Sequence, residues 1–199
     1  MDVKYMVVGP YQTNCYFIID EETKATAVVD PGSAASEILR NVKEQGLDIK
    51  MILLTHGHFD HTGAVAELHE ATGAPVYMNE RDLYNYETKP ENLEIINYGD
   101  GDELTLGSMK IKVIETPGHT PGSVSLIVED QLFCGDTLFM GSCGRTDFPG
   151  GSYPQILRSL KRLYDLEGNY IVYPGHDRVT SLDFERAHNP YMRECLKAE

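Results

Sequence analysis

The chain reads Thr55-His56-Gly57-His58-Phe59-Asp60-His61-Thr62-Gly63-Ala64, which places three imidazoles and one carboxylate within six positions. The apolar run 51–54 before this stretch is typical of a short buried strand, and Gly73 ends a helical pattern after it. Side chains alternate along extended backbone, so His56 and His58 point to the same side. A polar turn that is rich in histidine by chance is the weaker interpretation. The cluster predicts a metal site between the end of a strand and the start of a helix.

The same arrangement recurs at three later points of the chain. An apolar run, a Pro-Gly turn and a histidine follow one another at 113–119 and again at 170–176. A third strand-like run, 131–134, is followed by a glycine and Asp136. Ligands bind just past the ends of strands in layered α/β folds, so these side chains belong with the first cluster. The sequence therefore yields seven candidate metal ligands: His56, His58, Asp60, His61, His119, Asp136 and His176.

These motifs resemble the five-motif signature of metallo-β-lactamase-fold hydrolases. Asp30, in Val28-Val29-Asp30-Pro31-Gly32, matches the first motif, and the seven candidate ligands match the others in order. The resemblance covers nearly the whole chain. Within the superfamily, residues 141–149 and 185–191 are most similar to short, single-domain glyoxalase II-like enzymes, the hydroxyacylglutathione hydrolases. Periodicity alone supports only an α/β or α+β chain, whereas the resemblance implies a four-layer αββα sandwich.

Seven ligands exceed the four of one tetrahedral site, which favours two metal ions that share a bridging ligand. The resemblance implies that one ion is held by His56, His58 and His119. It implies that the other ion is held by Asp60, His61 and His176, with Asp136 as the bridge. Nitrogen and oxygen ligands suit several divalent transition metals. We expect zinc, with iron and manganese as alternatives.

The resemblance also implies a hydrolase in which Asp60 and Asp136 are the catalytic side chains beside a metal-bound hydroxide. A metal lowers the pKa of its bound water from 15.7 towards about 7. A thiolate, whose thiol has a pKa of about 8.5, departs without a general acid, whereas an amine needs one. No spare acidic group accompanies the ligand motifs. The expected reaction is therefore hydrolysis of 2-hydroxyacyl thioesters such as S-lactoylglutathione. Several true β-lactamases carry a cysteine at the position of Asp136, which argues against that activity.

Two alternatives remain open. A persulfide dioxygenase of this fold has a loop like Gly144-Arg145-Thr146-Asp147-Phe148 and uses a single iron. A metal-binding scaffold with a relict site is the non-enzymatic alternative, although no ligand is missing. Full-length glyoxalase II carries a further helical domain whose basic residues hold glutathione. The chain ends shortly after His176, so we expect those contacts to be absent and the thiol carrier to be open.

Three further residues are expected to orient the ligand rings: Asp30, Thr55 and Thr120. Metal-bound histidines usually donate their second N–H to a carboxylate, a carbonyl or water, which fixes the ring. Arg145 is a candidate substrate contact, although an ion pair with Asp147 is the favoured interpretation.

Length and charge limit the class of protein. At 199 residues we expect one hydrolase domain over 1–199, and a net charge of −14 argues against nucleic acid as partner. The sequence lacks an apolar stretch of the roughly 18 residues that span a bilayer, and its start lacks a signal-peptide core. We expect a cytoplasmic location, no membrane partner, free cysteine thiols and a small acyl thioester as substrate; the oligomeric state is left open.

The expected elements form two similar halves. Strands are expected at 3–8, 16–19, 25–29, 51–54 and 75–78, and again at 110–114, 123–128 and 131–134. Helices are expected from about Ser33 to Gly46 and from Pro154 to Gly168, each with apolar residues on one face. The Tyr-rich segment 80–101 is expected to be an insertion near the mouth of the site. His69 and His188 are expected at the surface.

Overall fold

The computed structural model describes residues 1–197, and strand β2 (Thr13–Ile19) is buried at every position. Side chains alternate between the two faces of a strand. Cys15 and Phe17 accordingly pack into one apolar core cluster, whereas Tyr16 and Ile18 pack into another. A strand with apolar core on both faces has to lie between two other layers.

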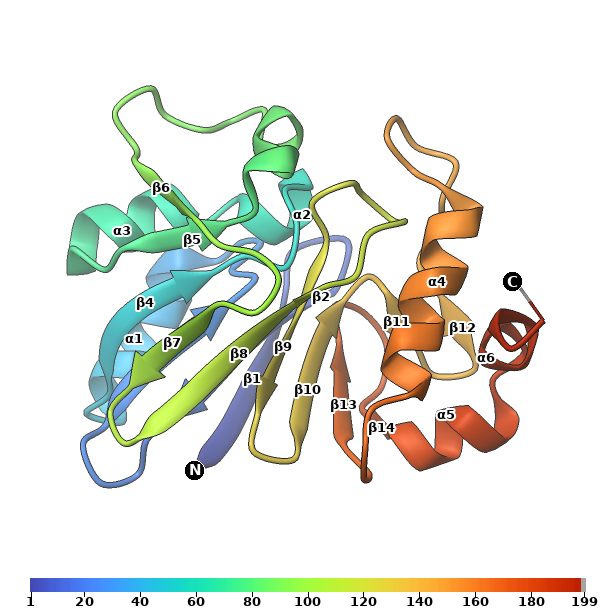
Figure 1. Ribbon diagram of the computed structural model, residues 1–199. Helices are drawn as coiled ribbons and strands as arrows, with labels where there is room; N and C mark the ends of the chain where they lie inside the picture. Colours follow the sequence, from blue (N-terminus) through green and yellow to red (C-terminus); the bar gives the residue numbers. More distant parts are fainter. Residues whose placement is uncertain (198–199) are drawn as a thin grey trace.

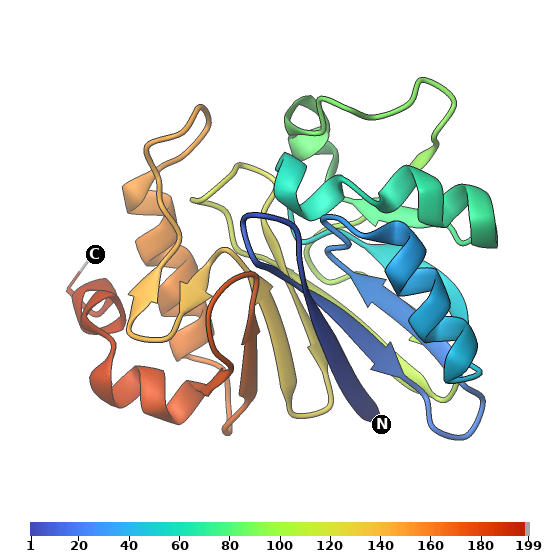
Figure 2. The ribbon, with the colours of Figure 1, turned by 180° about the vertical axis from the view of Figure 1, so that it is seen from behind.

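Three apolar core clusters separate four layers of structure. The first cluster joins the sheet that contains β2 to helices α1 (Ala35–Glu44) and α3 (Val65–Thr72). The second cluster lies between the two sheets. The third joins the second sheet to helix α4 (Tyr153–Tyr164) and the two helices that follow it. Helices thus cover the outer face of each sheet (Figures 1 and 2), and the predicted αββα sandwich is confirmed.

Within the described residues, each of the two main sheets has six strands. The first has the order β1-β2-β3-β4-β5-β6, with strands β1 (Asp2–Val8), β2, β3 (Ala25–Val29), β4 (Asp48–Leu53), β5 (Val76–Met78) and β6 (Ile95–Asn97). The second has the order β14-β13-β10-β9-β8-β7, with strands β7 (Glu103–Leu106), β8 (Met109–Glu115), β9 (Val124–Val128), β10 (Gln131–Gly135), β13 (Ile171–Pro174) and β14 (Thr180–Ser181). A small hairpin of β11 (Leu138–Phe139) and β12 (Ser142–Cys143) follows β10.

The expected strands and helices are present, with shifted ends. Strand β3 matches its predicted bounds, β2 begins three residues earlier than predicted, and β4 begins at Asp48 rather than at residue 51. Helix α4 carries Ile156, Leu160 and Leu163 on its buried face, at the spacing that predicted it. It ends at Tyr164, with Asp165 as its C-cap, ahead of Gly168.

The segment 80–101 is more than the expected insertion. It contains the 3-10 helix η1 (Glu80–Asn85), and β6 extends the first sheet by pairing with β5. Asp82, Tyr86, Leu93 and Tyr98 are buried. These residues belong to the packed interior, so the polar composition of the segment was a misleading signal.

The end of the described chain is also structured. Helices α5 (Leu182–His188) and α6 (Pro190–Cys195) pack on α4, and neither was among the expected helices. Ser181 caps α5 and Asn189 caps α6 through side-chain oxygens. Among the described residues, no helix has the length and apolar character that crossing a bilayer requires.

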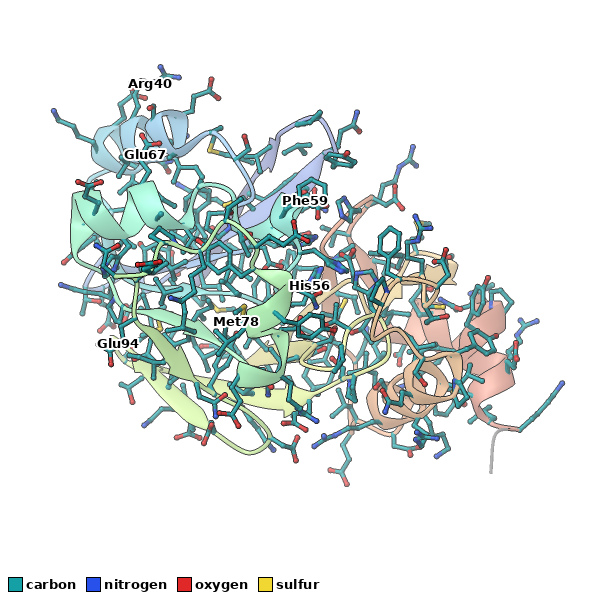
Figure 3. All side chains as sticks on the ribbon, turned by 90° about the horizontal axis from the view of Figure 1, so that it is seen from above. Arg40, His56, Phe59, Glu67, Met78 and Glu94 are labelled. Atoms are coloured by element: carbon teal, nitrogen blue, oxygen red, sulfur yellow. The ribbon has the colours of Figure 1, made fainter. Side chains whose placement is uncertain are left out.

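The topology brings the turns that carry the predicted ligands to one edge of the sandwich. Strands β3, β4 and β5 run parallel, as do β10 and β13, so the carboxyl ends of these strands face the same way within each sheet. Asn14 at the start of β2 joins the sheets there, since its backbone N–H donates to Gly175 O at 2.8 Å. Seen from above, His56 lies between the half of the molecule that holds Arg40 and Glu67 and the half formed by the later chain (Figure 3).

Candidate metal centre

Both sheets contribute side chains to a cluster at this edge. His56 and His58 follow β4, while Asp60 and His61 lie in the short helix α2 (Phe59–Thr62) that comes next. From the second sheet come side chains that follow three different strands: His119 after β8, Asp136 after β10 and His176 after β13. The structure therefore brings all seven predicted ligands to one place, and five of them are less than one-fifth exposed.

The cluster divides into two triads. The possible ligand atoms of His56, His58 and His119 lie within 4.8 Å of one another, and so do those of Asp60, His61 and His176. Ring nitrogens face each other inside each triad: His58 Nδ1 is 3.0 Å from His119 Nε2, and His61 Nε2 is 3.3 Å from His176 Nε2. These are the two groups that the resemblance implied.

Asp136 lies between the triads. Its Oδ2 is 3.5 Å from Nε2 of both His119 and His176, and its Oδ1 is 3.5 Å from His61 Nε2. The carboxylate therefore reaches one member of the first triad and two members of the second. A group with two oxygens in this position can serve both triads at once.

The donor atoms fit a divalent cation. Within residues 1–197, the buried atoms His56 Nε2 and Asp136 Oδ1 have no hydrogen-bond partner, and such orphaned atoms are rare unless an ion or water satisfies them. Burial holds the pKa of His56 well below its ordinary value, so its imidazole is neutral and offers a lone pair. Burial also lowers the pKa of His58 to about 4. Neutral imidazoles beside carboxylates are the donors that divalent transition metals take.

Asp60 remains ionised. Although burial opposes it, the hydrogen bond from His176 and the charge of His61 lower the pKa of Asp60 to about 2. Burial lowers the pKa of His61, but Asp136 and Asp30 outweigh this effect and raise it to about 9. Binding of an ion by His61 therefore releases a proton from this ring.

Asp30 orients two of the ligand rings. Its Oδ2 accepts a hydrogen bond from Thr55 Oγ1 at 2.6 Å and lies 3.1 Å from His61 Nδ1. Thr55 Oγ1 is in turn 3.1 Å from His56 Nδ1, so each ring keeps its Nε2 for the centre. The predicted contacts of Asp30 and Thr55 with ligand rings are present. Asp30 is also held at φ 50, an uncommon conformation outside glycine.

Thr120 has a different role from the predicted one. Its hydroxyl lies 2.7 Å from Ser123 Oγ, so it braces its own loop rather than a ligand ring. The second nitrogen of His119, Nδ1, instead lies 2.7 Å from the carbonyl oxygen of Arg145. A backbone carbonyl 26 positions away gives no signal in the sequence, which is why the prediction was wrong.

The Pro-Gly-His turns need their glycines for close approach. A Cβ on Gly175 would lie 2.2 Å from Asp136 Oδ1, and a Cβ on Gly118 would lie 2.3 Å from the backbone nitrogen of Ile156. Any larger residue would push Asp136 or helix α4 away. The repeated motif is therefore a packing requirement of the centre.

A cleft of about 530 Å³ opens over the cluster. Aromatic side chains and two members of each triad line it, together with Asp136, Cys143 and Arg145. Arg145 donates two hydrogen bonds of 2.7 Å to Asp147, and its guanidinium lies 3.8 Å from the centre of the Phe148 ring. The predicted ion pair is present, and Arg145 also borders the cleft. His69 and His188 lie outside it and contact the backbone oxygens of Ala74 and Phe184.

Sequence reasoning missed two buried acidic residues that shape the centre. Asp82 accepts hydrogen bonds from the backbone N–H groups of Gly57 and Gly122, which lie in two different ligand loops. Glu185 accepts one from Gly141 N–H, in the hairpin beside the cleft. Acidic residues in polar segments look solvent-exposed in a single sequence, and only the fold shows that these two are fully buried.

Comparisons with known proteins agree with this geometry. A family model described as the metallo-beta-lactamase superfamily matches residues 8–176. The hydroxyacylglutathione hydrolase GloC of Haemophilus influenzae is 33% identical over 96% of this chain and 98% of its own length.

Two solved structures are also similar. The B3 metallo-beta-lactamase BLEG-1 superposes with a TM-score of 0.88 at 33% identity, covering 96% of this chain and 99% of that one. A di-iron-bound form of TTHA1623 superposes with a TM-score of 0.86 at 37% identity, covering 94% and 99%. A family match of this extent, on this fold and around such a cluster of donors, shows that the chain is a metal-dependent hydrolase of the metallo-β-lactamase superfamily.

Proposed function

We propose that the protein is a binuclear metal-dependent thioesterase that hydrolyses 2-hydroxyacyl thioesters, in the manner of glyoxalase II. The observation that carries the proposal is the position of Asp136, within 3.5 Å of ligand atoms from both triads. A carboxylate shared by both triads is suited to two ions, whereas a single ion would leave one of its oxygens unused. Similarity to GloC supports the substrate class.

Two divalent transition-metal ions, which we propose to be zinc, would supply an activated water and a Lewis acid for the thioester carbonyl. His56, His58 and His119 would hold one ion, and Asp60, His61 and His176 the other. Asp60 lines the cleft, with its Oδ2 3.2 Å from His176 Nε2, and would help to orient the attacking water. Asp30 and Thr55 keep two ligand rings in place.

The leaving group favours a thioester over an amide. The cleft carboxylates Asp60 and Asp136 are both engaged with histidines, and the low pKa of Asp60 leaves no proton on it to donate. An amine would need such a proton, whereas a thiolate leaves without one. The reaction therefore has the groups that it needs among the described residues.

The requirement for oxygen distinguishes the proposed thioester hydrolysis from persulfide dioxygenation. The metal-reconstituted protein is assayed without oxygen for thiol release from S-lactoylglutathione and other 2-hydroxyacyl thioesters. Oxygen uptake on glutathione persulfide and cleavage of a chromogenic cephalosporin are measured beside it. We expect anaerobic thiol release; brisk oxygen uptake or cephalosporin cleavage without thiol release would refute the thioesterase.

Metal analysis tests the binuclear part. Elemental analysis after reconstitution should give close to two ions per chain. A single ion, even at excess metal, would contradict the bridge and favour the mononuclear iron alternative. Bound metal without cleavage of any of these substrates would instead favour the metal-binding scaffold with a relict site.

A further inference from the structure

Aromatic rings flank both metal triads in the cleft. The Phe148 ring meets His58 edge to face with centroids 5.8 Å apart, and the Phe139 ring lies 6.2 Å from that of His176. On the side of Asp60, Tyr11 and Phe59 form an edge-to-face pair at 5.1 Å. A substrate whose carbonyl lies at the metals would therefore meet aromatic surface beside each triad.

These rings are unusually exposed for aromatic side chains. Tyr11 is 59% exposed, Phe59 53% and Phe148 43%. Tyr11 and Phe59 also border a second hollow of about 390 Å³, which Val8 and Pro10 help to line. An apolar group of the substrate that extends beyond Tyr11 and Phe59 would remain in contact with apolar side chains. Its burial there would contribute favourably to binding.

The cleft has little to offer an anionic carrier. In the described part of the chain, Arg145 is the one lysine or arginine that lines it, and Asp147 already accepts both of its hydrogen bonds at 2.7 Å. Glutathione brings two carboxylates, which call for charged partners when they leave water. Arg178 follows His176 along the chain but does not line the cleft. The net charge of −14 adds long-range repulsion.

Resting on the thioesterase function proposed above, we propose that the preferred substrates are thioesters of an uncharged, apolar thiol, whose carbon group lies on these rings. Water forms the new C–O bond as the C–S bond breaks, and the departing thiolate takes up the proton that the water gives up. The acyl part is unchanged from the proposed function, and only the thiol carrier is specified.

The test compares two thioesters of the same lactoyl group. The metal-reconstituted protein is given S-lactoylglutathione and the S-lactoyl ester of phenylmethanethiol, and kcat/KM is measured for each. We expect the phenylmethyl ester to be preferred roughly tenfold or more, mostly through a lower KM, because one ring becomes buried. Phe59→Ala and Phe148→Ala should each reduce this preference several-fold. Phe184→Ala, which removes a similarly exposed ring from helix α5, is the matched control and should leave it unchanged.

The possible failures can be told apart. An equal or higher kcat/KM for the glutathione ester would overturn the inference about the thiol but leave the proposed thioesterase function intact. If Arg178→Ala then lost activity on the glutathione ester, Arg178 would be the group that binds the glutathione carboxylates. A preference that neither phenylalanine variant changes would also overturn it. If the fully loaded protein cleaves neither ester, the proposed function itself is wrong.

A separate observation concerns Asp82. Its Oδ2 accepts a hydrogen bond from Gly57 N–H at 2.8 Å, and its Oδ1 accepts one from Gly122 N–H at 2.6 Å. Gly57 lies between His56 and His58, and Gly122 lies three positions after His119. One fully buried carboxylate thus ties together the two loops that carry the first triad.

The surroundings of Asp82 leave the loops little freedom. A Cβ on Gly57 would lie 2.5 Å from the Asp82 carbonyl oxygen, and one on Gly122 would lie 2.6 Å from its Oδ1. Helix η1 is itself anchored, because Asn79 caps it and donates to Tyr98 O at 3.1 Å. We infer that Asp82 is a positioning residue that sets the affinity of the first triad for its ion.

Metal titration of the stripped protein tests this role. Asp82→Ala should weaken binding of one zinc ion about tenfold or more and that of the other ion much less, because Gly57 adjoins His56 and His58, whereas Asp60 and His61 lie three and four positions further along the same loop. Asp82→Asn keeps the volume and one acceptor oxygen, so it should give a smaller loss and serves if the alanine variant fails to fold. Calorimetry measures both affinities directly.

Asp20→Ala is the matched control. Asp20 is also a buried carboxylate that accepts backbone N–H groups, from Ser108 at 2.6 Å and Glu22 at 2.9 Å. It lies at the far end of the sheets, where the β2–β3 and β7–β8 turns meet (Figure 1). The control should lose stability without losing metal affinity. Equal affinities in the Asp82 and Asp20 variants, or equal weakening of both ions, would overturn the assignment.

Discussion

At the scale of single residues, buried carboxylates organise this protein by accepting several bonds at once. Asp30 holds Thr55 and His61, while Asp136 faces both triads. A carboxylate has about four acceptor positions, so it can join groups that an amide or hydroxyl cannot. Each of these positions can be tested by a substitution that removes the oxygens and little else.

Replacement of Asp136 tests the shared ligand. Asp136→Ala should lower the bound metal below one ion per chain and reduce hydrolysis by more than about a hundredfold, since both triads lose an anionic partner. Elemental analysis and thiol release measure the two effects. His69→Ala and His188→Ala remove imidazoles outside the cleft and should change neither. A variant that keeps two tightly held ions and normal turnover would show that Asp136 is no ligand.

Asp20 gives a stability effect that depends on pH. The backbone N–H of Ser108, helped by that of Glu22, lowers the pKa of Asp20 to about 2, below the ordinary value of about 3.9. The unfolded chain therefore binds the extra proton first, and the stabilisation present above pH 4 disappears as the pH falls towards 2. Urea unfolding should show Asp20→Asn less stable at pH 6, with the difference from the original protein shrinking by pH 3. A difference that is constant over this range would contradict the assignment.

At the scale of elements, the last two helices hold the hairpin beside the cleft. Asn189 donates to the backbone oxygens of Phe139 and Ser142 at 3.2 and 3.0 Å, and its Oδ1 caps helix α6. Glu185 in α5 accepts from Asn189 and from Gly141 N–H. The helices after the last ligand thus position a wall of the cleft, although they contribute no ligand themselves.

Asn189→Ala should separate this bracing from ordinary capping. We expect a loss of about 2–4 kcal/mol in unfolding free energy, because a cap is lost and two part-buried backbone oxygens lose their donor. Burial raises the pKa of the Cys143 thiol to about 11, so a loosened hairpin should also make this thiol react faster with an alkylating reagent. Ser181→Ala removes only the cap of α5 and should cost about 1 kcal/mol with no change at Cys143. Equal alkylation rates in the two variants would show that Asn189 does not hold the hairpin.

At the scale of the whole molecule, the metal centre joins the two halves of the sandwich. Four ligands follow strand β4 of the first sheet, and the remaining three follow strands of the second sheet. An ion held by both sheets binds only when they are correctly packed, so binding stabilises the folded state.

Chelation should therefore lower the melting temperature. At free metal a thousandfold above Kd, one site contributes about 4 kcal/mol, which corresponds to a shift of roughly ten degrees in a chain of this size. Calorimetry of the loaded and chelated protein measures the shift. In Asp136→Ala the two melting temperatures should nearly coincide. If the original protein melts at the same temperature with and without its ions, the ions do not join the sheets.

Local sequence patterns predicted those features of the fold and of the site that depend on residues close together in the chain. The ligand motifs, the strand ends that carry them and the amphipathic helix α4 could be read because each has its period or spacing within a few residues. The family resemblance then implied the αββα layers and the division into two triads. Element ends shifted by a few residues, because tertiary contacts decide where a strand stops pairing.

Only the tertiary structure decided which residues far apart in the chain contact one another. Asp82 lies 25 positions from Gly57 and 40 from Gly122, and His119 is oriented by the carbonyl of Arg145 rather than by Thr120. No periodicity shows that an acidic residue in a polar segment is buried, or which backbone group faces a ring. The sequence by itself therefore determined the donors and their order, because ligand chemistry resides in side-chain type. Their positions and their partners came from the packing of the two sheets, because burial and hydrogen bonding depend on the whole chain.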